Sequence, residues 1–276
     1  MNKLIKSLIY GGDVSLSVLE TTELVNKAIQ IHNLTPSAGV TLGGLLTACA
    51  YMSGCLKSEV GAVSLTVKSA DGLGSVSVSG DINLNIRGYI DCEGEGKLKG
   101  GYLTVIKDDG FFRPFVGTCE LISDDVSQNL MHYFDKSEQI PTAVAIGVEI
   151  QGGVCVCAGG VVMQMMPGFK QESMDAAEEA MQSFVDVKSV LKELGADGIM
   201  EKFFSEDIKK MATYSLFPEY KCNCSRKKIE ERVITPLGRE EAENIIAEEG
   251  KISVHCHYCN TDHIFTAKDI EKLFKK

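Results

Sequence analysis

Two closely spaced cysteine pairs near the C-terminus constrain this chain more than any other feature. The pairs are Cys222-Asn-Cys224 and Cys256-His-Tyr-Cys259, with 31 residues between them. Both lie in the last 56 residues, a segment with few large apolar side chains. Two close thiol pairs on either side of a helical insert can converge on one tetrahedral zinc ion, and a segment this small needs such a constraint to fold. The pattern predicts that all four cysteines bind zinc, one ion per chain.

Three histidines crowd the second pair: His255, His257 and His263. Four thiolates already complete a tetrahedral site, so we expect the histidines to be neighbours of the metal and not its ligands. The usual zinc-ribbon signature has CxxC on both sides of an insert of roughly 15–20 residues, and this sequence departs on both counts. The cysteines of a CxC pair in an extended chain lie about 6.6 Å apart, near the upper limit for a disulfide, so a bond between them is strained and readily reduced.

Loss of the metal would remove more folding free energy than local disulfides restore. Structural zinc contributes roughly 10–16 kcal/mol to a small module, whereas closing three- and four-residue loops contributes only ~1.6 and ~1.9 kcal/mol. Pairing of sequence neighbours would therefore release zinc and unfold the segment, while a bridge across the insert would hold its ends together. Four cysteines allow three pairings, and spacing alone does not choose among them.

The remainder of this last segment, residues 220–276, predicts alternating helices and a hairpin. Ser225 is placed to cap a helix over 226–234, Pro236 and Gly238 are expected to interrupt it, and Gly250 is expected to stop a second helix over 239–249. A strand over 251–256, a CxxC turn, a strand over 263–266 and a final helix complete the predicted zinc-binding domain.

Residues 1–170 predict an α+β domain with largely antiparallel strands. Apolar and polar residues alternate over 62–69, 75–90 and 101–107, as in half-buried strands, while the spacing between Val18 and Met52 is helical. Residues 142–168 predict two strands joined by a glycine turn. Cys155 and Cys157 fall in the second of these and are expected to share one face of it without a redox role.

Residues 171–219 predict a helical linker. Apolar residues follow helical spacing from Ser173, glycines at 195 and 198 break the run, and a second amphipathic piece spans 199–211. Residues 170–216 carry 6 Lys and Arg against 10 Asp and Glu. Two such helices cannot bury their apolar faces alone, so we expect them to dock on another domain through a contact of marginal stability.

Composition and charge exclude several classes of protein. The 276 residues carry a formal charge of −10 and 44% apolar residues, without an apolar run long enough for a membrane span or a secretory leader. We therefore expect a cytoplasmic protein without a membrane or nucleic-acid partner. In a reducing compartment, clustered cysteines indicate metal binding or redox sensing, and the isolated ones are expected to be inert: Cys49, Cys55, Cys92 and Cys119.

The sequence resembles the thirty-three-kilodalton heat-shock protein family of bacterial redox-regulated holdase chaperones. The strongest resemblance is the stretch from Cys222 to Asn260, with CxCS, the helix start "LGREE" and the turn CxxCN. It extends upstream through "YFDKSEQIPTAVAIGVEI", "GGVVMQMMPG" and "TLGGLLTA", and so covers nearly the whole chain.

The resemblance implies an ATP-independent chaperone, not an enzyme. It implies that Cys222, Cys224, Cys256 and Cys259 hold zinc in a reduced, inactive form. It further implies that peroxide with heat, or hypochlorous acid, pairs Cys222 with Cys224 and Cys256 with Cys259, releases zinc and unfolds the C-terminal unit with the adjoining linker. The exposed surface would then bind unfolding proteins, and the activated form would dimerise.

Two rival functions have a sequence feature that separates them from the chaperone. A zinc-ribbon module that binds nucleic acid or the ribosome is disfavoured by the weak field of residues 221–276, with 11 Lys and Arg against 10 Asp and Glu. A thiol oxidoreductase would require an active-site CxxC at a helix start in a thioredoxin-like pattern, and the four-thiolate arrangement is instead a closed site.

Overall fold

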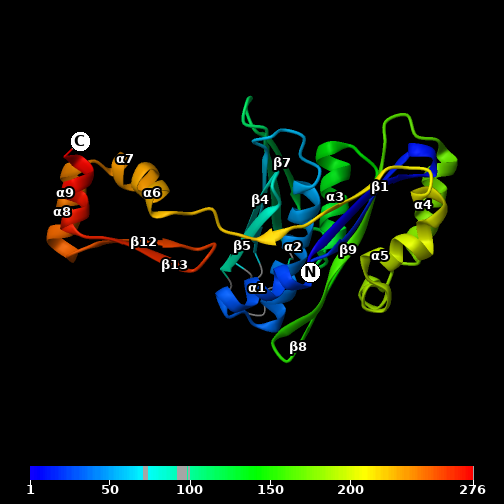
Figure 1. Cartoon of the computed structure of the whole chain (residues 1–276), viewed down its shortest axis with the longest axis horizontal. Helices are drawn as coiled ribbons and strands as arrows, with labels where there is room; N and C mark the ends of the chain where they lie inside the picture. Colours follow the sequence, from blue (N-terminus) through cyan, green and yellow to red (C-terminus); the bar gives the residue numbers. More distant parts are fainter. Residues whose placement is uncertain (71–73, 92–97, 99, 276) are drawn as a thin grey trace. The chain divides into compact units, whose positions relative to one another are not determined.

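The structure is a computed structural model that describes residues 1–70, 74–91, 98 and 100–275 (Figure 1). The chain divides into two compact units, Met1–Lys221 and Cys222–Lys276. The elements are mixed helices and mostly antiparallel strands, which confirms the α+β prediction. In the described part of the chain, no helix has the length and apolar character that crossing a bilayer requires.

The first sheet of the larger unit has the strand order β10-β1-β2-β9-β8, with every neighbouring pair antiparallel. Its strands are β1 (Lys3–Ile9), β2 (Val14–Glu20), β8 (Thr142–Gln151), β9 (Val154–Met165) and β10 (Thr213–Leu216). The glycine turn between β8 and β9 lies where the sequence predicted it. By contrast, β1 and β2 are buried on both faces and lack the alternation by which strands are recognised, so the sequence did not predict them.

The second sheet has the order β11-β5-β4-β3-β6-β7. Its strands are β3 (Ala62–Ser69), β4 (Ser75–Asp81), β5 (Asn85–Asp91), β6 (Gly101–Asp108), β7 (Phe115–Glu120) and β11 (Glu219–Tyr220). Only the short β11 runs parallel to its neighbour, β5. β3 and β4 bury every second side chain, which is why their positions were predictable.

Helix α2 (Pro36–Ser53) packs against strands of both sheets, and α1 (Thr22–His32) packs beside it (Figure 1). Thr35 caps α2 by accepting a hydrogen bond from the amide of Ala38, and nearly every α2 residue from Ala38 onward is buried. Added Cβ atoms at Gly43 and Gly44 would lie 2.9 Å from side-chain carbons of Val25 and Val126. The glycines of "TLGGLLTA" therefore permit this close packing. Helix α3 (Val126–Tyr133) continues as a π-helical turn over Phe134–Glu138, and Tyr10–Gly12 forms a 3-10 turn.

Helices α4 (Gln171–Gln182) and α5 (Val187–Ile208) cover the face of the first sheet that α2 leaves open (Figure 1). Their apolar residues join Ile5, Val18 and Met163 of the sheet in one buried cluster. The predicted break occurs at Gly195, whose φ of 62° and ψ of 179° are open only to glycine, while a second break after Gln182 was not predicted. The expected docking of this helical pair is thus observed within the larger unit.

Polar contacts tie the same two helices to the first sheet. The Asp13 carboxylate accepts from Ser173 Oγ at 2.7 Å, and Lys3 Nζ lies 2.6 Å from Asp197. The Tyr10 amide donates to Asp207 at 2.7 Å. The chain then enters the two sheets as β10 and β11, so the last residues of the predicted linker belong to strands. The division into three domains stays a prediction.

The prediction that Cys155 and Cys157 share one face of the strand was wrong. A β-bulge in β9 pairs Glu149 with Cys157 and Ile150 with Cys155, leaving the intervening residue out of register. Adjacent partners point to opposite faces, so the bulge turns the two thiols apart. Cys155 packs with Val25 beneath α1, and Cys157 packs in the cluster covered by α4 and α5.

The smaller unit contains helices around one hairpin. Its elements are α6 (Arg226–Ile229), a π-helical turn (Glu230–Ile234), α7 (Thr235–Leu237), α8 (Arg239–Glu249), β12 (Ile252–Cys256), β13 (Thr261–Phe265) and α9 (Ala267–Phe274). Ser225 caps α6 and Gly250, with φ of 77°, ends α8, as predicted. Pro236 does not interrupt the helix as expected, because a π-helical turn precedes it and the helical path continues to Leu237.

Truncation of Phe184 should loosen α4 and α5 from the sheet. Phe184 is 1% exposed and its ring lies 5.1 Å from that of Phe203, whereas its neighbour Val185 is 84% exposed. We expect Phe184→Ala to lower the free energy of unfolding by about 3–5 kcal/mol and Val185→Ala to change it by less than about 0.5 kcal/mol. Urea unfolding with limited proteolysis of residues 171–208 measures both. Equal effects of the two variants would contradict the observed packing.

Candidate metal centre

The first cysteine pair lies in an irregular segment that precedes α6. The Ser225 hydroxyl accepts a hydrogen bond from the Lys228 amide, which starts the helix immediately after Cys224. Lys228 Nζ donates to the carbonyl of Asn223 at 2.7 Å, between the two cysteines. The amide of Cys224 also donates to Cys222 Sγ at 3.5 Å. These bonds fix the loop on which both thiols are carried.

Arg226 connects this loop to the hairpin. Its guanidinium donates to the carbonyl of Ile264 at 2.6 Å, lies 4.3 Å from the ring centre of Phe265 and pairs with Asp269 at 3.0 Å. Phe265 is one of the five buried residues of the unit's core. From the sequence, the basic residues of 221–276 were weighed only by their net charge, whereas the structure gives Arg226 and Lys228 positioning roles.

The second cysteine pair lies at the tip of the hairpin formed by β12 and β13. Cys256 is the last residue of β12, paired with Thr261, and the amide of Cys259 donates to the carbonyl of Cys256 at 3.3 Å. Asn260 has a φ of 52°, a left-handed conformation that Asn tolerates better than most residues. The turn therefore directs both thiols toward the same point.

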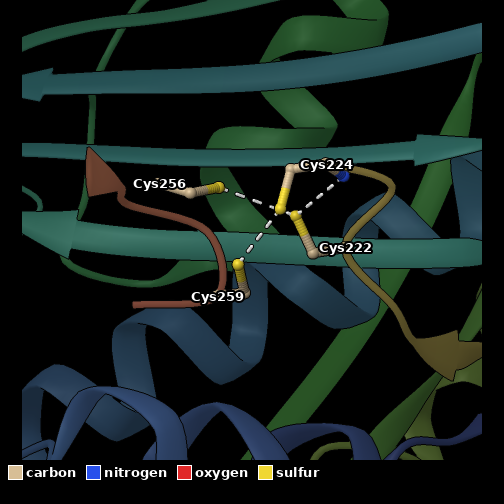
Figure 2. A group of neighbouring side chains, drawn as sticks. All are labelled: Cys222, Cys224, Cys256 and Cys259. Atoms are coloured by element: carbon tan, nitrogen blue, oxygen red, sulfur yellow. Dashed lines mark hydrogen bonds between the residues drawn. The ribbon is translucent and has the colours of Figure 1, made fainter. Parts of the chain in front are cut away.

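The structure brings the four predicted cysteines together (Figure 2). Their sulfur atoms all lie within 4.8 Å of one another, with 3.7 Å between Cys222 and Cys256 and 3.4 Å between Cys224 and Cys259. Sulfur atoms at the corners of a tetrahedron with metal–sulfur bonds of 2.3 Å are about 3.8 Å apart. The donor set and its spacing therefore suit a tetrahedral metal ion bound by four thiolates.

Proton affinities differ among these thiols. Burial, followed by hydrogen bonds to neighbouring thiols, raises the pKa of Cys224, and burial also raises the pKa of Cys222. Burial acts in the same direction on Cys259, but hydrogen bonds from Thr261 and Cys224 outweigh it and lower the pKa of that thiol. Four adjacent negative charges repel one another, so full ionisation of the cluster requires a cation among them.

The three histidines differ in their contacts, and their role at the metal centre stays a prediction. His263 Nε2 is 3.6 Å from Cys224 Sγ, and His255 Nδ1 is 2.7 Å from a carboxylate oxygen of Asp262. The rings of His255 and His257 meet edge to face, with 5.1 Å between their centres. His263 is thus placed to donate a hydrogen bond to the sulfur atom of Cys224.

The other cysteines that the structure describes have different environments. Burial raises the pKa of Cys49 to about 12 and that of Cys119 and Cys155 to about 11. Burial also raises the pKa of Cys157. Such thiols stay protonated and unreactive, in agreement with the expectation for Cys49 and Cys119. Cys55 is exposed, and Cys92 lies outside the described residues.

Comparison with known proteins finds one family that is similar to this chain over nearly its whole length. The Hsp33 protein family profile matches residues 2–266. The 33 kDa chaperonin of Bacillus mycoides is 34% identical over 99% of this chain and 98% of its own length, and that of Acetivibrio thermocellus is 34% identical over 96% and 94%. The crystal structure of the 33 kDa chaperonin (heat shock protein 33 homolog) from Thermotoga maritima superposes with a TM-score of 0.87 at 26% identity, covering 99% of this chain and 98% of that one.

Fold and site together define an α+β protein with a four-thiol centre in a small C-terminal unit. The chain belongs to the Hsp33 family.

Replacement of one thiol should weaken metal binding strongly. If roughly 10–16 kcal/mol of binding free energy is shared equally by four ligands, Cys222→Ser lowers zinc affinity by about 100- to 1000-fold. His257→Gln, between the two hairpin cysteines but outside the cluster, is the matched control and should change affinity by less than about threefold. Competition titration with a chromogenic chelator measures both. An unchanged affinity in Cys222→Ser would contradict the assigned ligand set.

Acidification should release the metal. Protons and metal compete for the same sulfur atoms, and the raised pKa values of Cys222 and Cys224 strengthen the proton in that competition. Zinc affinity should therefore rise with pH and fall, by up to about tenfold per thiol for each pH unit, as the solution is acidified. Chelator titrations between pH 6 and 8 should show this slope. A flat profile would indicate that the cysteines are not the ligands.

Proposed function

We propose that this protein is a redox-regulated, ATP-independent chaperone that acts in the cytoplasm on unfolding proteins. The proposal rests chiefly on the cluster of four thiols in a unit whose own buried core is only five apolar side chains. Chaperone function is supported by the family and by the name 33 kDa chaperonin given to its relatives. The reduced, zinc-bound form is the inactive state.

The small unit depends on its thiols for stability. Fifty-five residues with so limited a core bury too little apolar surface to offset the conformational entropy of folding. Cys222, Cys224, Cys256 and Cys259 would hold one zinc ion and, through it, join the loop before α6 to the hairpin. When bound, zinc would keep all four sulfur atoms as thiolates, the species that oxidants attack.

Oxidation removes the ligands. In each pair, two thiols lose two electrons and two protons to form a disulfide, and hydrogen peroxide is reduced to two molecules of water. We propose the pairs Cys222–Cys224 and Cys256–Cys259, as the family resemblance implies. Each of these bonds closes only a short loop and restrains the unfolded chain little. The smaller unit then loses its fold. In the structure, Cys222 Sγ lies 3.7 Å from Cys256 Sγ and Cys224 Sγ lies 3.4 Å from Cys259 Sγ, so the proposed pairing requires the sulfur atoms to exchange neighbours.

Helices α4 and α5 supply the latent binding surface. They bury an apolar cluster on the first sheet, including Leu16, Val161 and Met163, and their own residues Phe184, Leu191 and Phe204. Release of these helices from the sheet would expose the apolar surface of the helices and the apolar surface of the sheet together. A broad apolar surface binds unfolded proteins without need of ATP. The same surface would allow the activated form to associate as a homodimer.

The rival function as a nucleic-acid or ribosome-binding module finds little support in the site. Of the basic residues nearest the cysteines, Arg226 is engaged with Asp269 and Glu230, and Lys228 with the carbonyl of Asn223. These contacts stabilise the fold of the smaller unit. Because they engage the charges of Arg226 and Lys228, the positive electrostatic potential near the cysteines is weak. A membrane partner is likewise not proposed.

Simultaneous measurement of zinc and chaperone activity tests the proposal. Peroxide at raised temperature should release one zinc per chain and convert the protein into a form that suppresses aggregation of a heat-unfolded client, with the same activity whether or not ATP is present. Reduction by dithiothreitol in the presence of zinc should reverse the conversion. Retention of zinc after complete thiol oxidation, or equal activity of the reduced form, would overturn the proposed switch.

A further inference from the structure

A second group of reactive side chains lies in the larger unit. Lys6 on β1 and Tyr51 on α2 both lie next to the sulfur atom of Cys55. Cys55 follows the end of α2 by two residues. None of the three belongs to the four-thiol cluster.

Lys6 is a buried cation without an acidic partner. It is 9% exposed, and its Nζ donates to the carbonyl of Gly54 at 2.8 Å and to Cys55 Sγ at 3.3 Å. Among the described residues, no carboxylate forms an ion pair with it. A buried ammonium group requires compensation, and here a helix C-terminal carbonyl and a sulfur atom provide it.

Tyr51 approaches the same sulfur atom from the protein interior. It is 4% exposed, and burial raises its pKa well above the ordinary value, with the neighbouring Cys55 thiol as the next cause. The phenol therefore keeps its proton beside the sulfur atom. Two buried polar groups thus fix the position of the thiol.

Cys55 is itself accessible. It is the exposed member of the cysteines described in the larger unit, where Cys49, Cys119, Cys155 and Cys157 are buried. A small oxidant can reach it without any opening of the fold. The thiolate is the form of a cysteine that reacts with oxidants.

We propose that Cys55 and Lys6 are a second oxidant-sensitive site, at which hypochlorous acid drives formation of a covalent sulfenamide bond between Sγ and Nζ. The 3.3 Å separation of these atoms places the nucleophile against the sulfur atom before the reaction begins. The site lies outside the metal centre, and its chemistry does not depend on the proposed zinc switch.

The reaction balances in two steps. The Cys55 thiolate attacks the chlorine of hypochlorous acid, which forms an S–Cl bond and releases hydroxide, and the sulfur is oxidised by two electrons. Hydroxide then takes one proton from the Lys6 ammonium group to give water. The neutral amine attacks the sulfur, the S–N bond forms, chloride leaves with the bonding electrons, and the second amine proton passes to solvent.

The crosslink would strengthen the part of the chain that must stay folded. It joins residues separated by 49 positions and ties β1 to the C-terminal end of α2. β1 also pairs with β10, the strand that follows α5. The bond would therefore keep the sheet intact while other parts of the chain unfold under the same oxidant.

Peptide mapping of the full-length chain by mass spectrometry tests the crosslink. After treatment with a few equivalents of hypochlorous acid, we expect most Cys55 in a peptide pair linked to Lys6, lighter by two hydrogen atoms and separated again by dithiothreitol. Cys55→Ser should abolish the linkage, and Lys6→Arg should abolish it while keeping the positive charge. Recovery of Cys55 unlinked to Lys6, as free thiol, sulfinate or disulfide, would overturn the proposal.

A second readout separates this site from the zinc switch. Oxidised wild-type protein and oxidised Cys55→Ser should release zinc equally, but the larger unit of the wild type should unfold at a temperature about 5 °C or more above that of the variant. Equal unfolding temperatures of the two oxidised proteins would show that no stabilising crosslink forms. Failure of zinc release in both would contradict the switch and leave the crosslink measurement valid.

Discussion

The convergence of four thiols on one point is the constraint on which, as we propose, the smaller unit depends. Five buried apolar residues form its core, too few to stabilise 55 residues without an additional link. The four sulfur atoms lie within 4.8 Å of one another, and four thiolates so close would repel one another unless a cation lay among them. Arg226 supports it by joining the CxC loop to the hairpin. A fold that depends on one set of bonds in this way can be lost in one chemical step.

The larger unit shows the opposite organisation. Its two sheets enclose α2, whose glycines permit close contact on every side, and the first sheet is covered again by α4 and α5. The covering helices are held by apolar packing and by a few exposed polar contacts, such as Lys3 with Asp197. Exposed ion pairs contribute little free energy, so the packing around Phe184 and Leu191 carries most of the attachment. The protein therefore keeps a large apolar face of the sheet buried beneath these two helices.

The cysteines of this chain differ in their expected reactivity because their thiols lie in different environments. Burial raises the pKa of Cys49, Cys119 and Cys155 and protects them from oxidants. The four thiols of the small unit are partly exposed and adjacent to one another. Cys55 is exposed beside a buried ammonium group. Cysteines of one chain thus serve packing and, as we propose, metal binding and covalent crosslinking, according to their neighbours.

The sequence alone determined the features that depend on local spacing. The CxC and CxxC pairs identified the four cysteines that converge, alternation located β3 and β4, and Ser225 and Gly250 marked helix ends, because each of these signals acts over a few residues. Only the tertiary structure decided the rest. β1 was hidden from pattern analysis because other elements bury both its faces, and a bulge reversed the expected orientation of Cys157 relative to Cys155. Lys6 meets Cys55 only because β1 passes the end of α2, and contacts between positions 49 residues apart leave no periodic trace in a sequence.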